Sequence, residues 1–242
     1  MKVALVTGSA TGVGRACAER FAQLGFAVAV NYSKSEAEAR ETVKLVESHG
    51  VPALLCKATV GDDAQVREMV AKVQRAFGGL DVLVNNAGTT HFVAHTDLEA
   101  ITDEIWDDIF QVNLKGAFYC CRAAMPLLKE RRGNIVSVSS VAGLTGMGSS
   151  IPYCASKGAM NTLTQSLAKA FGPEVRVNAV APGPILTRWL AGREAHIAKF
   201  LDQAPMQRAA LPEDIADAVI YLATGTTLTT GQVLVVDGGR TM

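Results

Sequence analysis

The chain has 242 residues, of which 49% are hydrophobic and 19% are charged. Lys plus Arg equals Asp plus Glu, at 23 each, so the formal net charge is zero. This balance argues against binding to nucleic acid or to an anionic membrane, which would call for a basic excess. The length suits one large α/β domain, and we expect residues 1–242 to form a single domain.

The amino-terminal residues and the cysteines predict a cytoplasmic protein. The apolar run after Met1 has the length of a strand and ends in a glycine, unlike a signal peptide. No apolar stretch reaches the roughly 18 residues of a membrane span. The five cysteines are odd in number and lack the Cys-x-x-Cys spacing, which is typical of reduced thiols in an intracellular protein.

Short apolar runs alternate with segments of helical periodicity along the whole chain. Near-continuous apolar runs are typical of parallel strands that are buried on both faces. Strands are predicted at residues 3–7, 27–31, 53–57, 82–84, 134–138, 175–180 and 233–236. Helical segments are predicted to begin near Gly14, Ser35, Asp62, Thr102, Pro152 and Pro212. This alternation predicts an α/β, three-layer, doubly wound Rossmann fold with a seven-stranded parallel sheet.

Glycines mark the turn after the first predicted strand. Gly8, Gly12 and Gly14 form the pattern Gly-x-x-x-Gly-x-Gly, and a helix is expected to follow. Glycines at such a turn let the backbone approach a pyrophosphate, and the helix N-terminus offers it free N–H groups. The motif therefore predicts a nucleotide site at the first strand-to-helix junction.

Polar residues follow two later strands. Asn85-Asn86-Ala87-Gly88 ends the fourth strand, and Ser140 follows the fifth. Tyr153 and Lys157 then lie four residues apart, on one face of a predicted helix. A nearby ammonium favours the phenolate form of a tyrosine, so we expect Lys157 to lower the pKa of Tyr153 and to suit it for proton transfer.

Taken together, these motifs resemble the short-chain dehydrogenase/reductase family, over essentially the whole chain. Asn113, Ser140, Tyr153 and Lys157 match its catalytic tetrad in order and spacing. The resemblance implies that Tyr153 is the general acid or base, that Lys157 lowers its pKa and holds the nicotinamide ribose, and that Ser140 holds the substrate oxygen. Asn113 would interrupt its helix and hold a water molecule that links Lys157 to solvent. No metal is required.

The resemblance also implies a set of cofactor contacts. They are expected from Gly8, Thr11, Gly12, Val13, Gly14, Ser33, Lys34, Thr59, Val60, Asn86, Ala87, Gly88, Tyr153, Lys157, Pro182, Gly183, Ile185 and Thr187. Relatives usually carry Asp or Asn where this chain has Thr59, which would meet the adenine.

The second predicted strand bears on the choice of cofactor. An acid at its end would bind the ribose 2′-hydroxyl of NAD, but none occurs before Glu36. Ser33 and Lys34 stand there instead, and a lysine suits a phosphate as a point charge. Thr11 argues the other way, because NADP-preferring relatives often have a basic residue at its position. We expect NADP(H), with NAD(H) as the alternative.

The resemblance implies a substrate pocket built from three segments: residues 140–153, the loop after Gly88, and a flap near residues 187–207. Their lining is expected to include Val141, Ala142, Thr145, Met147, Ser150, Ile151, His91, Phe92, Trp189, Leu190 and Met206. Most are apolar, which favours reduction of a ketone or 3-oxoacyl substrate to a secondary alcohol. The strongest likeness is to the 3-oxoacyl-(acyl-carrier-protein) reductase branch.

The sequence also allows other binding sites, partners and functions. His91 and His95 have the spacing of a metal pair, but no further ligand cluster joins them, and a place at the substrate entrance is favoured. Lys129, Arg131 and Arg132 could meet an acidic carrier protein. An NAD-dependent alcohol, sugar or steroid dehydrogenase is the alternative enzyme, and a non-catalytic nucleotide sensor is the alternative class. Relatives are usually homotetramers, which we also expect here.

Overall fold

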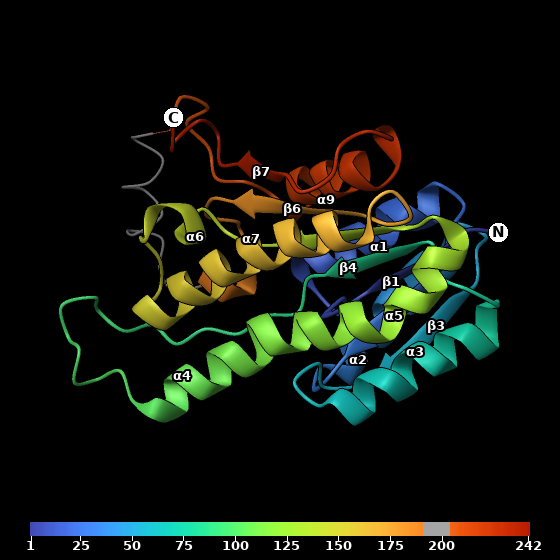
Figure 1. Cartoon of the computed structure of the whole chain (residues 1–242), viewed down its shortest axis with the longest axis horizontal. Helices are drawn as coiled ribbons and strands as arrows, with labels where there is room; N and C mark the ends of the chain where they lie inside the picture. The colour runs from blue at the N-terminus through green and yellow to red at the C-terminus, as the bar shows by residue number, and fades with distance from the viewer. Residues whose placement is uncertain (191–203) are drawn as a thin grey trace.

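The structure, a computed structural model, describes residues 1–190 and 204–242. Its centre is a parallel sheet of seven strands in the order β3-β2-β1-β4-β5-β6-β7 (Figure 1). The strands are β1 Val3–Val6, β2 Ala27–Tyr32, β3 Ala53–Lys57, β4 Val82–Asn85, β5 Asn134–Val138, β6 Arg176–Pro182 and β7 Val233–Val236. The predicted fold class and strand number are confirmed.

Helices cover both faces of the sheet, as the apolar strands require. Val6 on β1 packs into the core cluster that contains α1, α2 and α9, whereas Leu5 packs into the cluster of α3 and α5. Because successive side chains of a strand point to opposite faces, each apolar strand supplies both cores. The helices are α1 Gly12–Gln23, α2 Glu36–Ser48, α3 Asp63–Phe77, α4 Asp103–Phe110, α5 Ala117–Arg131, α6 Ala142–Thr145, α7 Ile151–Phe171 and α9 Pro212–Ile220.

Three further helical turns complete the described elements. A π-helical turn, η1 Gln111–Gly116, joins α4 to α5 and carries Asn113. A 3-10 turn, η2 Arg188–Leu190, begins the predicted flap, and residues 191–203 of that flap lie outside the described residues. A second π-helical turn, η3 Tyr221–Gly225, follows α9. None of the helices in the described ranges combines the length and hydropathy needed to cross a membrane.

The strand order fixes where a ligand can bind. The chain reverses its direction of winding between β1 and β4, which are neighbours in the sheet. In doubly wound sheets the loops diverge at such a point and leave a crevice at the carboxyl ends of the strands. The Gly8 turn follows β1 and Asn86 follows β4, so both motifs border this crevice.

Candidate functional site

A cavity of about 1200 Å³ opens at the carboxyl edge of the sheet. All but two of the predicted catalytic and cofactor-binding residues line it, from Gly8 and Lys34 at one end to Tyr153 and Lys157 at the other. The two exceptions are Gly14 and Asn113. The predicted set therefore converges on one site, although its segments lie far apart in the sequence.

The glycine turn is shaped for a close approach. Gly8 and Gly12 have φ values of +60° and +57°, a region that side chains disfavour. The N-cap of α1, Thr11, makes no side-chain capping hydrogen bond, so the first N–H groups of the helix have no side-chain acceptor. Gly14 serves packing instead, since a Cβ there would lie 2.5 Å from the Gly8 carbonyl oxygen. This turn fits the pyrophosphate of a dinucleotide.

Two side chains that the sequence analysis passed over hold the turn in place. The Asn31 Oδ1 accepts a hydrogen bond from the Gly8 N–H at 3.0 Å, and its Nδ2 donates to the carbonyls of Cys56 and Ala58. The Thr7 hydroxyl accepts from the N–H groups of Asn86 and Ala87. A polar residue within the apolar run of β2 was the available signal for Asn31. These bonds join β1, β2, β3 and β4 beneath the cavity floor.

Tyr153 stands at the other end of the cavity. Burial raises the pKa of Tyr153 to about 12, against a smaller lowering effect of its hydrogen bond with Ser140. Burial also lowers the pKa of Lys157 to about 8. The sequence analysis expected Lys157 to lower the pKa of Tyr153; in this structure burial raises that pKa instead. Tyr153 is therefore a neutral hydrogen donor at neutral pH.

Lys157 points its ammonium into the same space. The residue is 4% exposed, and Nζ donates to the Val138 carbonyl at 2.8 Å. Nζ lies 5.7 Å from the centroid of the Tyr153 ring. The ring of Trp189 meets Tyr153 edge-on, with 6.3 Å between the centroids. The Tyr153 phenol thus lies among a cation, a hydroxyl and an aromatic wall.

Asn113 supports this end from behind. The side chain is fully buried, its Oδ1 accepts from the Thr89 N–H at 2.8 Å, and its Nδ2 donates to the Thr89 carbonyl and to Ser156 Oγ, each at 3.1 Å. It therefore ties the loop after Gly88 to α7, the helix that carries Tyr153. As expected, Asn113 interrupts a regular helix, since it lies in the π-helical turn η1.

A second buried network fixes α7 to β5. Ser139 Oγ donates to Asn161 Oδ1 at 2.6 Å and lies 3.2 Å from the Lys157 carbonyl oxygen. Ser150 is buried, and its hydroxyl caps α7 by accepting from the Tyr153 N–H. The prediction that Ser150 lines the substrate pocket is wrong, because a fully buried capping serine faces its own helix.

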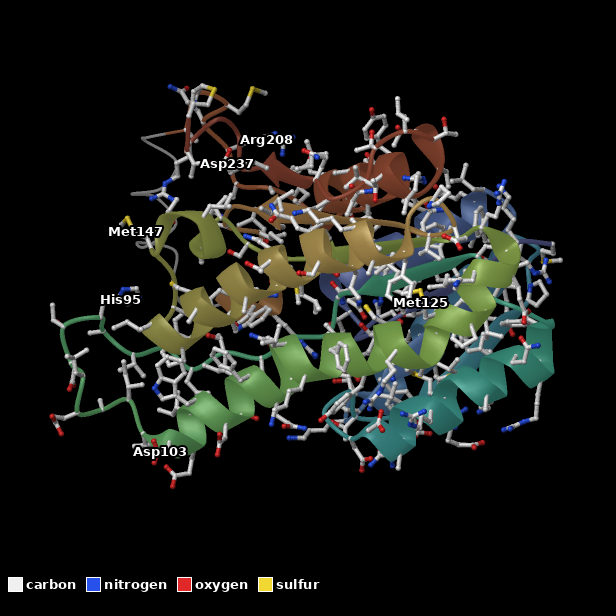
Figure 2. The ribbon with its side chains drawn as sticks, viewed as in Figure 1. His95, Asp103, Met125, Met147, Arg208 and Asp237 are labelled. Atoms are coloured by element: carbon white, nitrogen blue, oxygen red, sulfur yellow. The ribbon has the colours of Figure 1, made fainter. Side chains whose placement is uncertain are left out.

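The substrate end of the cavity is largely apolar. The predicted residues Phe92, Val141, Ala142, Met147 and Trp189 line it, whereas Thr145, Ile151, His91 and Met206 do not. The side chain of Leu190, also predicted to line the pocket, lies outside the described part of the structure. The loop after Gly88 contributes more than the sequence analysis predicted, since Thr90, Val93, Ala94 and His95 also line the cavity. Figure 2 shows His95 and Met147 at the end of the molecule toward which the strands point.

The two histidines have separate environments. His91 Nε2 lies 2.8 Å from Asp108 Oδ2, outside the cavity lining. The His95 Nε2 is buried without a hydrogen-bond partner among the described residues, and His95 lines the cavity. The entrance role therefore fits His95 and not His91. In residues 1–190 and 204–242, no three His, Cys, Asp or Glu side chains gather as metal ligands would.

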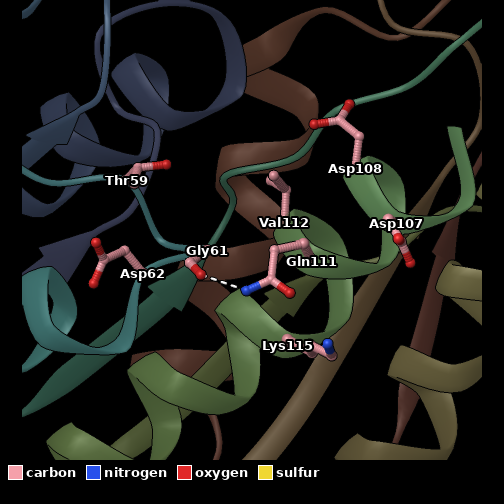
Figure 3. A pocket seen from close by; sticks show the side chains of 8 residues that line it. All are labelled: Thr59, Gly61, Asp62, Asp107, Asp108, Gln111, Val112 and Lys115. Carbon is pink, nitrogen blue, oxygen red and sulfur yellow. Dashed lines mark hydrogen bonds between the residues drawn. The ribbon is translucent and has the colours of Figure 1, made fainter. Parts of the chain in front are cut away.

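A smaller pocket adjoins the large cavity and shares Thr59, Asp108 and Val112 with it (Figure 3). The Gln111 amide, on η1, donates to the Gly61 carbonyl across its floor. Gly61, Asp62, Asp107 and Lys115 complete its lining. Thr59, at the position expected near the adenine, therefore faces both spaces.

The basic residues considered for a carrier protein lie away from the site. Lys129 and Arg131 are in the last turn of α5, which leads into the amino end of β5, whereas Ser140 follows its carboxyl end. Lys129 Nζ is 3.8 Å from Glu174, and Arg131 donates to the Gly78 carbonyl. The structure thus places these cations at the edge of the sheet opposite the cavity.

Known proteins resemble this chain along nearly its whole length. A sequence model of the family described as enoyl-(acyl-carrier-protein) reductase matches residues 8–241. A protein of Streptomyces violaceoruber named as a ketoacyl reductase of the granaticin polyketide synthase is 44% identical over 241 residues, covering 98% of this chain and 95% of the relative. The 3-oxoacyl-[acyl-carrier-protein] reductase FabG of Staphylococcus aureus is 38% identical, covering 100% and 98%.

A solved structure agrees with these sequences. The short-chain dehydrogenase of Burkholderia cenocepacia, in complex with NADP, superposes with a TM-score of 0.93 at 34% identity and covers 100% of this chain and 98% of that one. The ordered motifs, the doubly wound sheet and these full-length similarities lead to one conclusion. The chain belongs to the short-chain dehydrogenase/reductase family of enzymes.

Proposed function

We propose that this enzyme is an NADP(H)-dependent reductase that converts a ketone or 3-oxoacyl substrate into a secondary alcohol. The observation that carries the proposal is the convergence of Ser140, Tyr153 and Lys157 at the apolar end of a cavity whose other end holds the glycine turn and Lys34. The names of the ketoacyl and 3-oxoacyl reductases among its relatives support the same chemistry.

The reaction needs a proton at the carbonyl oxygen, and Tyr153 is the proposed donor. When bound, NADP(H) supplies the hydride. Tyr153 keeps its proton at neutral pH, since burial raises its pKa to about 12. The Ser140 hydroxyl, which lines the same end of the cavity, holds the substrate oxygen beside the phenol. As negative charge develops on Tyr153 during transfer, the buried Lys157 ammonium stabilises it.

The cofactor assignment rests on the turn after β2. Ser33 and Lys34 line the cavity there and are exposed, and β2 ends without an acid. The glycine turn and the uncapped α1 fit the pyrophosphate, whereas Thr59 and Val60 are proposed to border the adenine. The NADP complex of the Burkholderia cenocepacia relative supports this choice.

The substrate class follows from the lining. Phe92, Val141, Met147 and Trp189 offer an apolar wall, and Ser149 and His95 add polar atoms. Such a wall favours an acyl chain or an aryl group next to the reacting carbonyl. The 3-oxoacyl group would be free or attached to a carrier protein.

We also propose a cytoplasmic homotetramer of single-domain subunits, on the family likeness. All five cysteines are free and buried. β7 is an edge strand on which Leu234 and Val235 are 38% and 39% exposed, an apolar surface that a second subunit would cover. Light scattering gives the assembly directly, and a monomeric mass would refute it.

A substrate panel with both nucleotides tests the function. We expect oxidation of NADPH in the presence of acetoacetyl thioesters and simple aryl ketones, with kcat/KM higher for NADPH than for NADH. Turnover of secondary alcohols with NAD alone would favour the dehydrogenase alternative. Nucleotide binding without turnover of any carbonyl in the panel would favour a sensor.

A further inference from the structure

The segment that follows β6 touches both ends of the cavity. After Pro182 the chain crosses the glycine turn, where a Cβ on Gly12 would lie 3.4 Å from Thr187 Cγ2. Arg188 and Trp189 then follow in η2, and both line the cavity. These two neighbours in the sequence contact different parts of the cavity wall.

Arg188 reaches the turn after β2. Its Nη2 donates to Ser35 Oγ at 3.3 Å, and its Nη1 lies 3.6 Å from Glu38 Oε1. Ser35 follows Lys34, the residue expected to meet the cofactor phosphate, and both line the cavity with Arg188. Sequence reasoning missed Arg188, because 153 residues separate it from Ser35.

The charges at this turn favour an anion. Glu36 forms an ion pair with Arg40 at 2.7 Å. Two cations at this turn, Lys34 and Arg188, line the cavity. Within the described residues, Lys34 makes no ion pair, and Arg188 is paired only with Glu38. A guanidinium can bind a phosphate through two parallel hydrogen bonds. We expect that contact to be stronger than the ion pair with Glu38, whose oxygen lies 3.6 Å from Arg188 Nη1.

Trp189 reaches the catalytic end. Its ring meets the ring of Tyr153 edge-on at 6.3 Å with an interplanar angle of 78°. A Cβ on Gly88 would lie 3.7 Å from Trp189 Cη2, so the indole also covers the Asn85–Gly88 turn. An edge-to-face aromatic pair contributes a modest interaction energy, which favours one relative orientation of the two rings.

We infer that Arg188 is a cofactor-specificity residue that binds the 2′-phosphate of NADP(H) together with Lys34, and that Trp189 transmits this contact to the position of Tyr153. The inference rests on the proposed NADP(H) function and adds to it a link between the two ends of the cavity. When the nucleotide has no 2′-phosphate, Arg188 keeps its contacts with Ser35 and Glu38. The position of Trp189 then does not change.

Tryptophan fluorescence tests this link without turnover. The chain has two tryptophans, so Trp106→Phe leaves Trp189 as the single reporter. Adenosine 2′,5′-bisphosphate carries the phosphate in question but has no nicotinamide, and adenosine 5′-monophosphate is its matched control. We expect the bisphosphate to bind more tightly and to change the Trp189 emission, and the monophosphate to leave that emission unchanged.

Two variants in this background separate binding from coupling. Arg188→Gln should weaken bisphosphate binding roughly tenfold and abolish the emission change at saturation. Lys34→Gln should weaken binding several-fold but keep the full emission change at saturation, because within the described residues it is Arg188, and not Lys34, that joins the turn after β2 to the Trp189 segment by a hydrogen bond and an ion pair. Circular dichroism checks that the variants fold. We expect Arg188→Gln to fold, because the Arg188 side chain is 63% exposed.

The outcomes distinguish the two levels of the proposal. If the bisphosphate binds the parent no better than the monophosphate, the NADP(H) assignment fails and this inference fails with it. If the parent prefers the bisphosphate but Arg188→Gln keeps that preference, or keeps the emission change, only the role of Arg188 is refuted.

Discussion

The two ends of the cavity are built in opposite ways. Around Tyr153 the polar side chains are buried and hydrogen-bonded within the fold: Lys157 is 4% exposed, Ser139 is 3% exposed and Asn113 is fully buried. Around the turn after β2, Lys34 is exposed, and the Arg188 side chain is 63% exposed and held by one hydrogen bond and one long ion pair.

This difference separates two tasks. Buried, fully bonded groups keep their geometry before a ligand arrives, which chemistry requires. Exposed charges are screened and add little to folding, so they are free to respond to a ligand. We therefore expect substitutions at the Tyr153 end to change rate and stability, and a substitution of Lys34 to change nucleotide preference without changing stability.

The largest effect should follow from removing the proton donor. Tyr153→Phe keeps the ring that meets Trp189 but loses the phenol hydroxyl. We expect kcat for carbonyl reduction to fall by about 10²–10⁴-fold, the usual contribution of general acid catalysis. Binding of NADP, followed by calorimetry, should change little. Turnover within a few-fold of wild type would show that Tyr153 is not the acid.

The next effect should be on folding. Asn113→Ala removes an amide that makes three hydrogen bonds to Thr89 and Ser156. We expect the free energy of unfolding to fall by roughly 3 kcal/mol, because buried partners are left unsatisfied. Urea denaturation measures this loss. Asn134→Ala is the matched control, since the Asn134 Oδ1 has no partner among the described residues and its loss should cost far less. Equal losses would contradict the supporting role of Asn113.

The sequence predicted the buried end better than the exposed one. Apolar runs and spacing were enough for the seven strands and for the gathering of Ser140, Tyr153 and Lys157, because the carboxyl ends of parallel strands share one edge. The direction of the shift in the Tyr153 pKa was not predictable, because it depends on how far the folded chain excludes water from the phenol. Arg188 was missed for another reason: its contact with Ser35 depends on the path of the chain after β6, which no local pattern specifies.

A smaller effect concerns the cost of the buried ammonium. Lys157→Met should raise the free energy of unfolding at pH 7 by about 1–2 kcal/mol, because a charge is replaced by an apolar side chain. Below pH 8 both folded and unfolded chains hold the Lys157 proton, so the burial cost is complete. Between about pH 8 and 10.5 the folded chain loses that proton first, and the cost disappears.

The stabilisation by Lys157→Met should therefore shrink as the pH rises toward 10.5. Urea unfolding of the variant and the wild type, compared at pH 7 and pH 10, measures the difference while cancelling other titrations. A gain that is equal at both values would mean that Lys157 keeps its ordinary pKa and that the Tyr153 end carries no such cost.

The smallest effect should appear at the exposed end. Lys34→Gln removes one of the two cations that line the cavity beside Ser35. We expect kcat/KM with NADPH to fall several-fold and kcat/KM with NADH to stay the same, because only the phosphate gains from that charge. The thermal midpoint should not move, since Lys34 makes no ion pair within the described part of the chain. Lys44→Gln, an exposed lysine on α2 outside the cavity lining, is the matched control. A lowered midpoint in Lys34→Gln, or equal losses with both nucleotides, would mean that the turn after β2 supports the fold and that the two ends of the cavity are not divided as we infer.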